Sequence, residues 1–463
     1  MAQTTHDLVV LGTGSGGEVV AGEVARAGGT VVAVDAGLVG GECPYVACVP
    51  SKVMLLAARE HVLVGGDHDA AFAKAVARRD EAAEQRQDDG AVQALQDDRV
   101  EVVRSRGVLA GRTGDGLLVQ VGERRLHARA VVIGTGSEPV IPPIKGLPDV
   151  PTWTSDQALS SPDRPARLAI LGGGAVGCEL AQVYASFGTD VVLLEAAPTL
   201  LGSEPPWVGE RLATALGELG VDVRTGVTIT GARPHGTGLA LQVDEVAGVI
   251  AERLLVAGGR RPRSADLGLG TVGAGPADNG SLAVDARCRV IGVDGTPVEG
   301  LFAVGDVTGV APYTHTATYQ ARIVAAHLLG HGRDADYSGV PRAVYTHPAV
   351  FGVGEQAEAA RARGVHALVD GIDLADTGRG FIAGARGGRL ELVVDASTGT
   401  LIGASAIGPE ADSWAGELAL AVRAGLDVRL LADQVHAFPA WSEAVQPVAG
   451  RLATQVEALR GAP

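Results

Sequence analysis

The fold is decided by the stretch LVVLGTGSGG, residues 8–17. Its first four residues are apolar and have the length and flanks of a buried parallel strand. The glycines at positions 12, 14 and 17 fit the pattern GxGxxG, and residues 18–27 are typical of the helix that follows such a loop. A second strand is predicted from Thr30 to Val34, and Asp35 stands at its end. A strand, a glycine loop, a helix, a strand and an acid in this order predict a dinucleotide-binding unit.

The same order of elements recurs further along the chain. Residues 168–171 predict a strand, GGGAVG at 172–177 is a second GxGxxG, residues 178–187 predict a helix, and residues 190–194 predict a strand before Glu195. The chain therefore carries two nucleotide-binding units, and their separation indicates two different dinucleotides. A carboxylate after the second strand bonds the ribose hydroxyls of the adenosine and repels a 2′-phosphate. Because no Arg or Lys occurs between Glu195 and Arg211, we expect NAD(H) rather than NADP(H) at the second unit.

The composition excludes several classes of function. The chain has 463 residues, of which 46% are hydrophobic, and a formal net charge of −16. So acidic a chain is not expected to bind nucleic acid, which requires a basic face. No apolar run approaches the ~20 residues that span a bilayer, and the first residues lack the regions of a signal peptide. Four cysteines are too few for a secreted disulfide framework, so we expect a cytoplasmic protein, without a metal site.

Two of the four cysteines lie in GGECPYVACVPSK, residues 40–52. Cys43 and Cys48 are five positions apart, between a glycine pair and a run that is typical of a helix. Two thiols next to a dinucleotide loop predict a dithiol/disulfide couple that exchanges electrons with a bound cofactor. A helix N-terminus favours the thiolate and lowers the pKa of a thiol placed there. Cys178 and Cys288 are interpreted as small core residues.

Five motifs make the chain resemble, nearly end to end, the FAD-dependent pyridine nucleotide–disulfide oxidoreductases, a family that includes lipoamide dehydrogenase, glutathione reductase and mercuric reductase. These motifs are the two GxGxxG loops, Cys-x4-Cys in residues 40–52, AGGRRP at residues 257–262, and the pair Gly305-Asp306. The resemblance implies an α/β fold with two Rossmann-like dinucleotide-binding domains and a C-terminal α+β dimerisation domain. The implied domains are residues 1–150 and 263–337 for FAD, 151–262 for NAD, and 338–463 for dimerisation.

The resemblance also implies the residues that hold the two cofactors. For FAD they are Gly12, Gly14, Gly17, Asp35, Gly41, Lys52, Gly136 and Asp306. For NAD they are Gly172, Gly174, Gly177, Glu195 and Gly258. In each loop the glycines would let the pyrophosphate approach the N-terminus of the following helix.

An electron relay is implied by the same resemblance. NADH would deliver hydride to one face of the flavin, and the reduced flavin would pass electrons to the Cys43–Cys48 disulfide on its other face. Cys48 would be the thiolate that contacts the flavin, and Cys43 would exchange with the substrate. Lys52 and Glu179 match the charged pair that lies near the flavin N5 in this family.

The C-terminal motif departs from the family's His-Pro-Thr-x-x-Glu. In HAFPAWSE, residues 436–443, Phe438 takes the place of the acid–base histidine, which the family supplies across its dimer interface. Phenylalanine cannot transfer a proton, and a positioned acid–base is worth ~10²–10⁴-fold in rate. His436 could act as a replacement base but is better interpreted as a structural partner. Glu443 would either bond the backbone or be an inherited residue without a role. Phe438 and Trp441 would make the pocket mouth apolar or pack in the dimer interface.

These features leave the electron acceptor open. The first interpretation is a homodimeric, NADH-preferring flavoprotein disulfide oxidoreductase that acts on a small-molecule thiol or disulfide. The alternatives are a diaphorase that reduces quinone-like acceptors directly from the flavin, a dihydrolipoamide dehydrogenase, and a low-turnover flavin redox sensor or partner subunit. His315 and His347 fall in motif-like stretches and are interpreted as structural.

Overall fold

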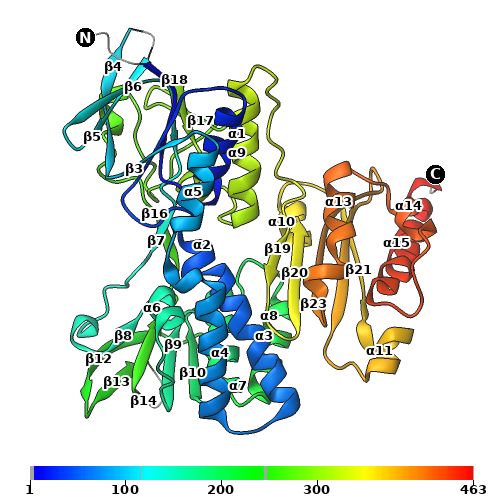
Figure 1. The fold of residues 1–463 in the computed structure, drawn as a ribbon. Coiled ribbons are helices and arrows are strands. Elements are labelled where there is room, and N and C mark those ends of the chain that lie inside the picture. Colours follow the sequence, from blue (N-terminus) through cyan, green and yellow to red (C-terminus); the bar gives the residue numbers. More distant parts are fainter. Residues whose placement is uncertain (1–4, 115, 245–247, 462–463) are drawn as a thin grey trace. The chain divides into compact units, whose positions relative to one another are not determined.

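The computed structural model describes residues 5–114, 116–244 and 248–461, which are drawn as a ribbon in Figure 1. The chain forms two compact units. The first consists of Met1–Ser51, Ala77–Val140 and Gly259–Ala335, and the second of Lys52–Val76, Ile141–Gly258 and Asp336–Pro463. The predicted division into three domains is finer than these two units and stays a prediction.

A twisted sheet forms the centre of the first unit. Its main path runs in the order β17-β18-β6-β1-β2-β3, with the bounds Arg289–Ile291, Pro297–Ala303, Arg124–Ile133, Thr5–Leu11, Val31–Asp35 and Glu101–Arg104. All neighbours on this path are parallel except β17 and β18. The strands β4 (Gly107–Thr113) and β5 (Gly116–Val121) extend β6 as an antiparallel hairpin. The parallel strands and the glycine loop after β1 agree with the Rossmann-like fold that the sequence predicts.

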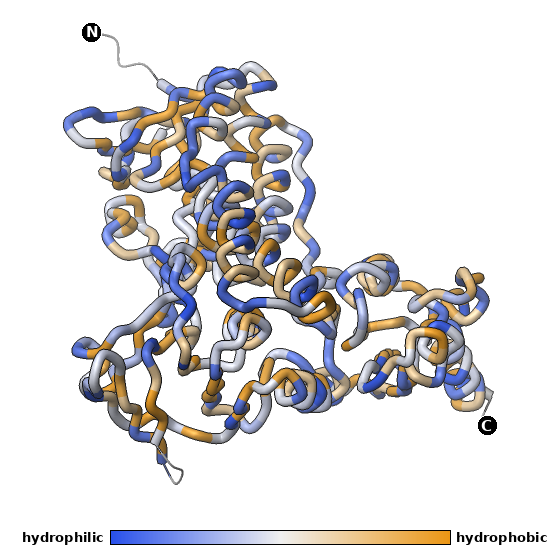
Figure 2. Tube along the Cα trace, turned by 60° about the horizontal axis from the view of Figure 1, so that its bottom comes forward, coloured by the Kyte–Doolittle hydropathy of each residue, from blue (hydrophilic) through white to orange (hydrophobic). Residues whose placement is uncertain are grey.

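Helices α1 (Ser15–Arg26) and α9 (Thr314–Leu328) lie side by side against one face of this sheet (Figure 1). Their apolar faces join Val20 and Val24 of α1 to Ala321 and Val324 of α9 in one buried cluster with β1 and β2. Along the helices apolar and polar residues alternate (Figure 2), as expected where one face is buried. Helices α1 and α9 pack side by side, and their first residues, Ser15 and Thr314, lie at the same end of the unit, near Cys43.

The second unit contains another parallel sheet, which carries the second glycine loop. Its order is β11-β10-β9-β15-β8, with the bounds Asp222–Thr225, Asp190–Glu195, Arg167–Leu171, Arg253–Val256 and Thr152–Trp153. Helices α6 (Ser155–Ser160), α7 (Ala175–Ser186) and α8 (Pro206–Glu218) accompany it, as do α3 (Cys48–Val64) from Lys52 onward and the first part of α4 (His68–Ala82). An antiparallel sheet of β12 (Ile229–His235), β13 (Gly238–Val243) and β14 (Val249–Ala251) was not predicted from the sequence.

The C-terminal part of the second unit is built on an antiparallel sheet. Its order is β19-β20-β23-β22-β21, with the bounds Arg342–Val344, Ala349–Gly354, Thr400–Gly408, Arg389–Asp395 and Ala367–Asp373. The long helix α15 (Val445–Gly461) packs against β21 and β22. Other helices here are α10 (Ala357–Ala362), α11 (Gly378–Ala383) and α14 (Val428–Asp433). This arrangement confirms the predicted α+β character of the region.

Two further breaks in regular structure occur in these regions. Residues 411–424 form α12 (Ala411–Trp414) and α13 (Gly416–Ala424), which are separated at Ala415. Strand β18 ends at Ala303, since the left-handed backbone of Gly305 (φ 78°) starts a 3₁₀ turn. Among the described residues, no helix is long and apolar enough to cross a membrane.

Candidate functional site

The first glycine loop leaves a space in front of helix α1. A Cβ added to Gly12 (φ 94°) would lie 2.5 Å from the carbonyl oxygen of Gly134, and one added to Gly17 would lie 2.0 Å from that of Gly12. These two glycines are therefore required by the packing of the chain itself. A Cβ on Gly14 would meet nothing nearer than the Cα of Gly41 at 4.0 Å. The open position lies where a pyrophosphate would approach the helix N-terminus.

The second loop repeats this arrangement in the other unit. A Cβ on Gly172 (φ 107°) would lie 2.4 Å from the carbonyl oxygen of Ala257, and one on Gly177 would lie 1.9 Å from that of Gly172. A Cβ on Gly174 or on Gly258 would have no neighbour within 4 Å. Both loops thus offer the cradle that a dinucleotide needs, and the residues present fit FAD and NAD(H).

In each unit, the acid at the end of the second strand accepts hydrogen bonds from the backbone of its own glycine loop. Asp35 accepts hydrogen bonds from the N–H of Thr13 (2.6 Å) and of Gly37 (2.7 Å). Glu195 accepts in the same way from the N–H of Gly173 at 2.5 Å. The structure therefore brings both predicted acids to their loops, with each carboxylate fixed at the edge where a ribose would lie.

The cysteine-bearing turn is docked on the first glycine loop. The N–H of Gly40 donates to the carbonyl oxygen of Thr13 over 2.9 Å. Gly41 has a φ of 74°, and a Cβ on it would lie 2.8 Å from the Cα of Gly14. Only glycine fits at this contact. The two cysteines follow at once, one in the short helix α2 (Glu42–Tyr45) and one at the first residue of α3.

The thiols of Cys43 and Cys48 contact each other and a shared hydroxyl. Thr314 Oγ1 donates to Cys43 Sγ over 3.3 Å and lies 3.5 Å from Cys48 Sγ. The pKa of Cys43 lies well above its ordinary value, because this thiol hydrogen-bonds to Cys48, is partly buried, and would share the site with a charge on Cys48; the hydroxyls of Thr314 and Ser15 oppose this shift. At Cys43 the contact with Cys48 and the burial thus oppose the lowering of the pKa that a helix N-terminus favours.

The remaining predicted FAD residues of the first unit lie together beside strand β7 (Ser137–Pro139). Asp306 accepts a hydrogen bond from the hydroxyl of Ser137 over 2.6 Å. Gly136, directly before Ser137, has a φ of 70° and open space where a Cβ would stand. The hydroxyl of Ser137 in turn accepts from Arg260 Nε over 2.8 Å.

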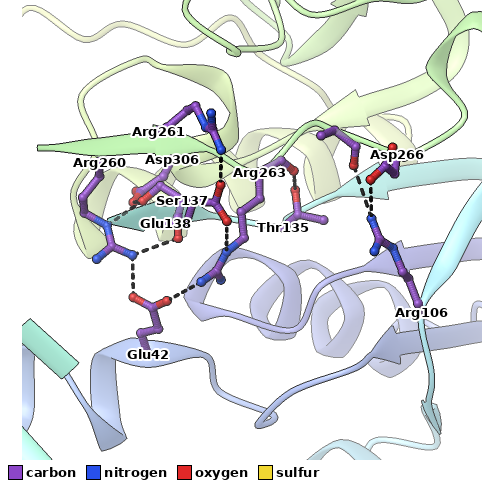
Figure 3. A network of polar contacts seen from close by, with 11 residues as sticks. Glu42, Arg106, Thr135, Ser137, Glu138, Arg260, Arg261, Arg263, Asp266 and Asp306 are labelled. Carbon is purple, nitrogen blue, oxygen red and sulfur yellow. Dashed lines mark hydrogen bonds and ion pairs between the residues drawn. The ribbon is translucent and has the colours of Figure 1, made fainter. Parts of the chain in front are cut away.

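Figure 3 shows that this group continues to the residue before Cys43. Arg260 donates to one carboxylate oxygen of Glu42 over 2.5 Å, and Arg263 donates to the other over 2.9 Å. Glu42 begins helix α2, so strand β16 (Arg260–Pro262) connects the cysteine turn to Ser137 and Asp306. Sequence reasoning quoted the arginines in a motif but did not predict this clamp.

Lys52 and Glu179 form the charged pair that the sequence predicts. Lys52 Nζ lies 2.7 Å from Glu179 Oε2 and 4.6 Å from the ring centroid of Tyr345. The other carboxylate oxygen of Glu179 accepts from the N–H of Tyr345 over 3.0 Å. Glu179 is 5% exposed, so its charge is held by Lys52 and by the backbone of Tyr345.

The C-terminal motif contains two buried polar atoms that lack hydrogen-bond partners within the described chain, His436 Nδ1 and Glu443 Oε2. His436 Nε2 lies 3.1 Å from both carboxylate oxygens of Glu417. Glu443 Oε1 accepts from the N–H of Arg379 over 2.8 Å. Phe438, by contrast, is 79% exposed. The buried, paired position of His436 agrees with its interpretation as a structural partner.

Trp441 does not take the place considered for it at a pocket mouth. It is 8% exposed, belongs to the apolar core of the C-terminal sheet, and has the guanidinium of Arg379 5.5 Å from its ring. Its large apolar surface is better satisfied in this core.

The remaining histidines and cysteines are placed as structural residues. Burial lowers the pKa of His347, whose backbone N–H donates to Gln182 over 2.7 Å. His315 stacks on Tyr313 with ring centroids 5.1 Å apart. Burial raises the pKa of Cys178. No group of three or more His, Cys, Asp or Glu residues suited to a metal ion occurs among the residues that the structure describes.

The comparisons with known proteins cover nearly the whole chain. Residues 6–321 match the family model "Pyridine nucleotide-disulphide oxidoreductase", and residues 340–449 match the dimerisation domain of the same family. This second match supports the predicted homodimer.

Curated relatives and solved structures agree with these matches. A dihydrolipoyl dehydrogenase from Thermus scotoductus is 34% identical, with 97% of this chain and 98% of the relative covered. The probable pyridine nucleotide–disulfide oxidoreductase RclA from Escherichia coli is 28% identical, covering 95% and 98% of the two chains. A solved Cu(II) complex of a C43S mutant of that HOCl-induced flavoprotein disulfide reductase has a TM-score of 0.85, 28% identity, and coverage of 97% and 99%.

The family's members use FAD and NAD(H), for which both glycine loops are suited. The paired thiols, the two cradles and the matches along the chain agree with one another. This protein therefore belongs to the pyridine nucleotide–disulfide oxidoreductases and is an FAD-dependent NAD(P)H–disulfide oxidoreductase.

Proposed function

We propose that this enzyme transfers electrons from NADH through the Cys43–Cys48 pair to a small-molecule disulfide, without an acid–base group at position 438. The observation that carries the proposal is the docking of the cysteine turn on the first glycine loop, through the 2.9 Å hydrogen bond from Gly40 to Thr13. This contact ties the two thiols to the loop proposed to hold FAD.

In this proposal the residues of the first unit bind and orient FAD, which supplies the two-electron chemistry between NADH and the thiols when it is bound. Gly14 gives the pyrophosphate room at α1, and Gly12, Gly17 and Gly41 allow the close backbone packing that shapes this space. The sugar and ribityl hydroxyls of FAD would bond to Asp35, Gly136 and Asp306.

The second unit holds the nicotinamide nucleotide through Gly172, Gly174, Gly177, Gly258 and Glu195. The carboxylate of Glu195 selects NADH, since it accepts hydrogen bonds from ribose hydroxyls and repels a phosphate. Lys52 and Glu179 form a fixed charged pair in this unit, and the family resemblance implies that this pair would act on the flavin.

Within the thiol pair, Cys48 is the sulfur that retains the negative charge after reduction. Cys43 attacks the substrate disulfide and forms a mixed disulfide with one substrate sulfur, while the other leaves as a thiol. Cys48 then attacks the sulfur of Cys43, which releases the second substrate thiol and returns the pair to a disulfide. The residues at the C-terminal motif do not move a proton in this scheme, because His436 is held by Glu417 and Phe438 has no ionisable group. Efficient turnover of dihydrolipoamide is therefore not expected.

A second candidate acceptor is one that needs no proton donor. The exposure of Phe438 (79%) favours a flat quinone-like compound, and Cu(II), which is present in solved complexes of the relative RclA, is reduced without taking up a proton. Two Cu(II) ions would take two electrons from the thiol pair, which would form its disulfide and release two protons. Reducing compartments keep such thiols available, so we expect this chemistry in the cytoplasm.

Steady-state assays of the holoenzyme test these assignments. NADH and NADPH are each compared with lipoamide, glutathione disulfide, mycothiol disulfide, a quinone and Cu(II), in the wild type and in Cys43→Ser. The proposal expects NADH oxidation with one of the disulfides, and its loss in Cys43→Ser. Full activity of Cys43→Ser with a quinone would instead assign the diaphorase reaction, and no turnover with any acceptor would favour the sensor.

A further inference from the structure

One side-chain hydroxyl lies between the two redox sulfurs. Thr314 Oγ1 is 3.3 Å from Cys43 Sγ and 3.5 Å from Cys48 Sγ, and all three residues belong to the first unit. We propose that Thr314 is a positioning residue that shares its one hydroxyl hydrogen between the two sulfurs and so directs the negative charge of the reduced pair from Cys48 to Cys43. The inference rests on the proposed function, in which Cys43 is the thiol that exchanges with the substrate.

The reduced pair has a charge on the wrong sulfur for exchange. In the proposed function Cys48 holds the negative charge after reduction, and the hydrogen bond to Cys48 raises the pKa of Cys43. Attack on a disulfide requires a thiolate. The charge must therefore move to Cys43 before the substrate can react.

A single proton transfer between the two thiols moves this charge. The proton of Cys43 passes to Cys48, which leaves Cys43 as the thiolate and Cys48 as the thiol, and no electrons are exchanged. During this transfer the hydroxyl hydrogen of Thr314 turns from Cys48 Sγ to Cys43 Sγ, with its O–H bond intact. A hydroxyl hydrogen rotates freely about its C–O bond, and both sulfurs are already within its reach.

The position of Thr314 in the fold makes this assistance directional. It is the first residue of α9, and its hydroxyl is fixed by a helix that packs along α1. Ser15, the first residue of α1, places a second hydroxyl near Cys43. Two hydroxyls thus favour a charge on Cys43, and the hydroxyl of Thr314 also lies 3.5 Å from Cys48 Sγ.

Several charged and titratable groups lie near the thiol pair along the chain. Those within about one turn of these residues are Glu18 on α1, Glu42 and Tyr45 on α2, Lys52 on α3, and Tyr313 and His315 at the start of α9. Burial raises the pKa of Glu18 and of Tyr45. Glu42 and Lys52 are in ion pairs. The hydroxyl of Thr314 lies close to both sulfurs, which suits it to redistribute the charge between them.

Selective alkylation of the reduced holoenzyme tests the role of Thr314. The protein is reduced with NADH without oxygen, treated with iodoacetamide from about pH 6 to about pH 10, and digested to measure alkylation of Cys43 and Cys48 by mass spectrometry. Thr314→Val removes the donor but keeps the shape, and Thr314→Ser restores the hydroxyl. Thr318→Val is the matched control, since the Thr318 hydroxyl lies one turn along α9 and donates to the carbonyl oxygen of Thr314 over 3.1 Å.

We expect Thr314→Val to slow alkylation of Cys43 at neutral pH about tenfold relative to Cys48, because a thiolate loses one donor. Thr314→Ser and Thr318→Val should stay within about twofold of the wild type. Equal ratios for Cys43 and Cys48 in Thr314→Val and in the wild type would overturn the inference. If Thr314→Val does not fold, Thr314→Ala provides the same comparison.

The proposed function is checked separately in the same samples. Reduction of the wild type by NADH should release two alkylatable thiols at Cys43 and Cys48. If no such thiols appear, the relay itself is wrong. If they appear and Thr314→Val behaves as the wild type, only the role of Thr314 is wrong.

Discussion

At the scale of single residues, position 438 determines which proton transfers the C-terminal motif can support. Phe438 is exposed, and its ring packs so closely on Gly378 that a Cβ there would lie 2.5 Å from it. The same added Cβ would lie 3.3 Å from Glu443 Oε1, so the ring and this carboxylate are neighbours. The other oxygen of Glu443 is buried without a hydrogen-bond partner. A carboxylate in this condition is suited to orient a hydrogen-bond donor placed at position 438.

Phe438→His should therefore introduce an acid–base group with its orienting carboxylate already in place. We expect kcat/KM for dihydrolipoamide to rise about 10- to 100-fold, below the ~10²–10⁴-fold of an evolved group, with a new ionisation near pH 6–7 in the rate profile. Phe438→Leu is the control for loss of the aromatic ring. A histidine variant no faster than the leucine variant would contradict the role assigned to Glu443.

Glu195 is the residue that we propose selects the nucleotide at the second glycine loop. Glu195→Gln keeps the shape that accepts the N–H of Gly173 but removes the charge that repels a 2′-phosphate. We expect the preference for NADH over NADPH to fall about tenfold, which corresponds to the ~1–2 kcal/mol of one partly screened charge. The ratio of kcat/KM for the two nucleotides measures this change. Asp190→Asn, at the other end of the same strand, should leave the ratio unchanged.

At the scale of elements, the ribbon of β7 and β16 connects the cysteine turn to the proposed FAD site (Figure 3). The register pairs Arg260 with Pro139 and Arg261 with Glu138. Because side chains alternate along a strand, Arg260 reaches Ser137 and Glu42, whereas Arg261 bonds Glu138. Arg260 and Arg261, which are neighbours on one strand, therefore bond different partners.

Arg260→Met should weaken FAD binding, because Ser137 loses the donor that fixes its hydroxyl toward Asp306. We expect the Kd for FAD to rise about tenfold, as for the loss of a hydrogen bond to a charged group. Fluorescence of released FAD during dilution measures this change. Arg261→Met is the matched control, since Arg261 is the next residue and its side chain is 65% exposed. Equal FAD release from both variants would show that the clamp does not position Asp306.

At the scale of the whole molecule, the C-terminal region carries apolar side chains that a single chain leaves in solvent. Phe381 and Ile382 of α11 are 85% and 61% exposed, and Val435 and Phe438 are 86% and 79% exposed. The match of residues 340–449 to a dimerisation domain accounts for such a surface, because dimer interfaces are richer in apolar area than other surfaces.

We expect a dimeric mass at micromolar concentration, measured by light scattering after size-exclusion chromatography. Phe381→Asp should raise the dimer dissociation constant at least ~10-fold, since a charge would be buried without a partner. Val293→Asp is the control, because Val293 is equally exposed (80%) but belongs to the first unit. A monomeric wild type, or a Phe381→Asp protein that dimerises normally, would contradict this assignment of the surface.

The amino-acid sequence by itself determined the two glycine loops, the strands and helices beside them, and the acids that grip them. These features depend on residues close together in the chain, such as Gly12 and Gly17, which belong to one short loop. The α+β character of the C-terminal region was likewise predicted, although the separation of α12 and α13 at Ala415 was not.

Only the tertiary structure decided which distant groups meet. It placed the hydroxyl of Thr314 between two sulfurs more than 260 positions away, joined Arg260 to Glu42, and put Trp441 in the core. It also brought Cys43 into contact with Cys48, which raises the pKa of the Cys43 thiol. Such contacts follow from the packing of helices and strands against one another, and no local spacing encodes them. The physical reason is that short-range backbone geometry sets each element, whereas burial and charge pairing set what surrounds the thiols.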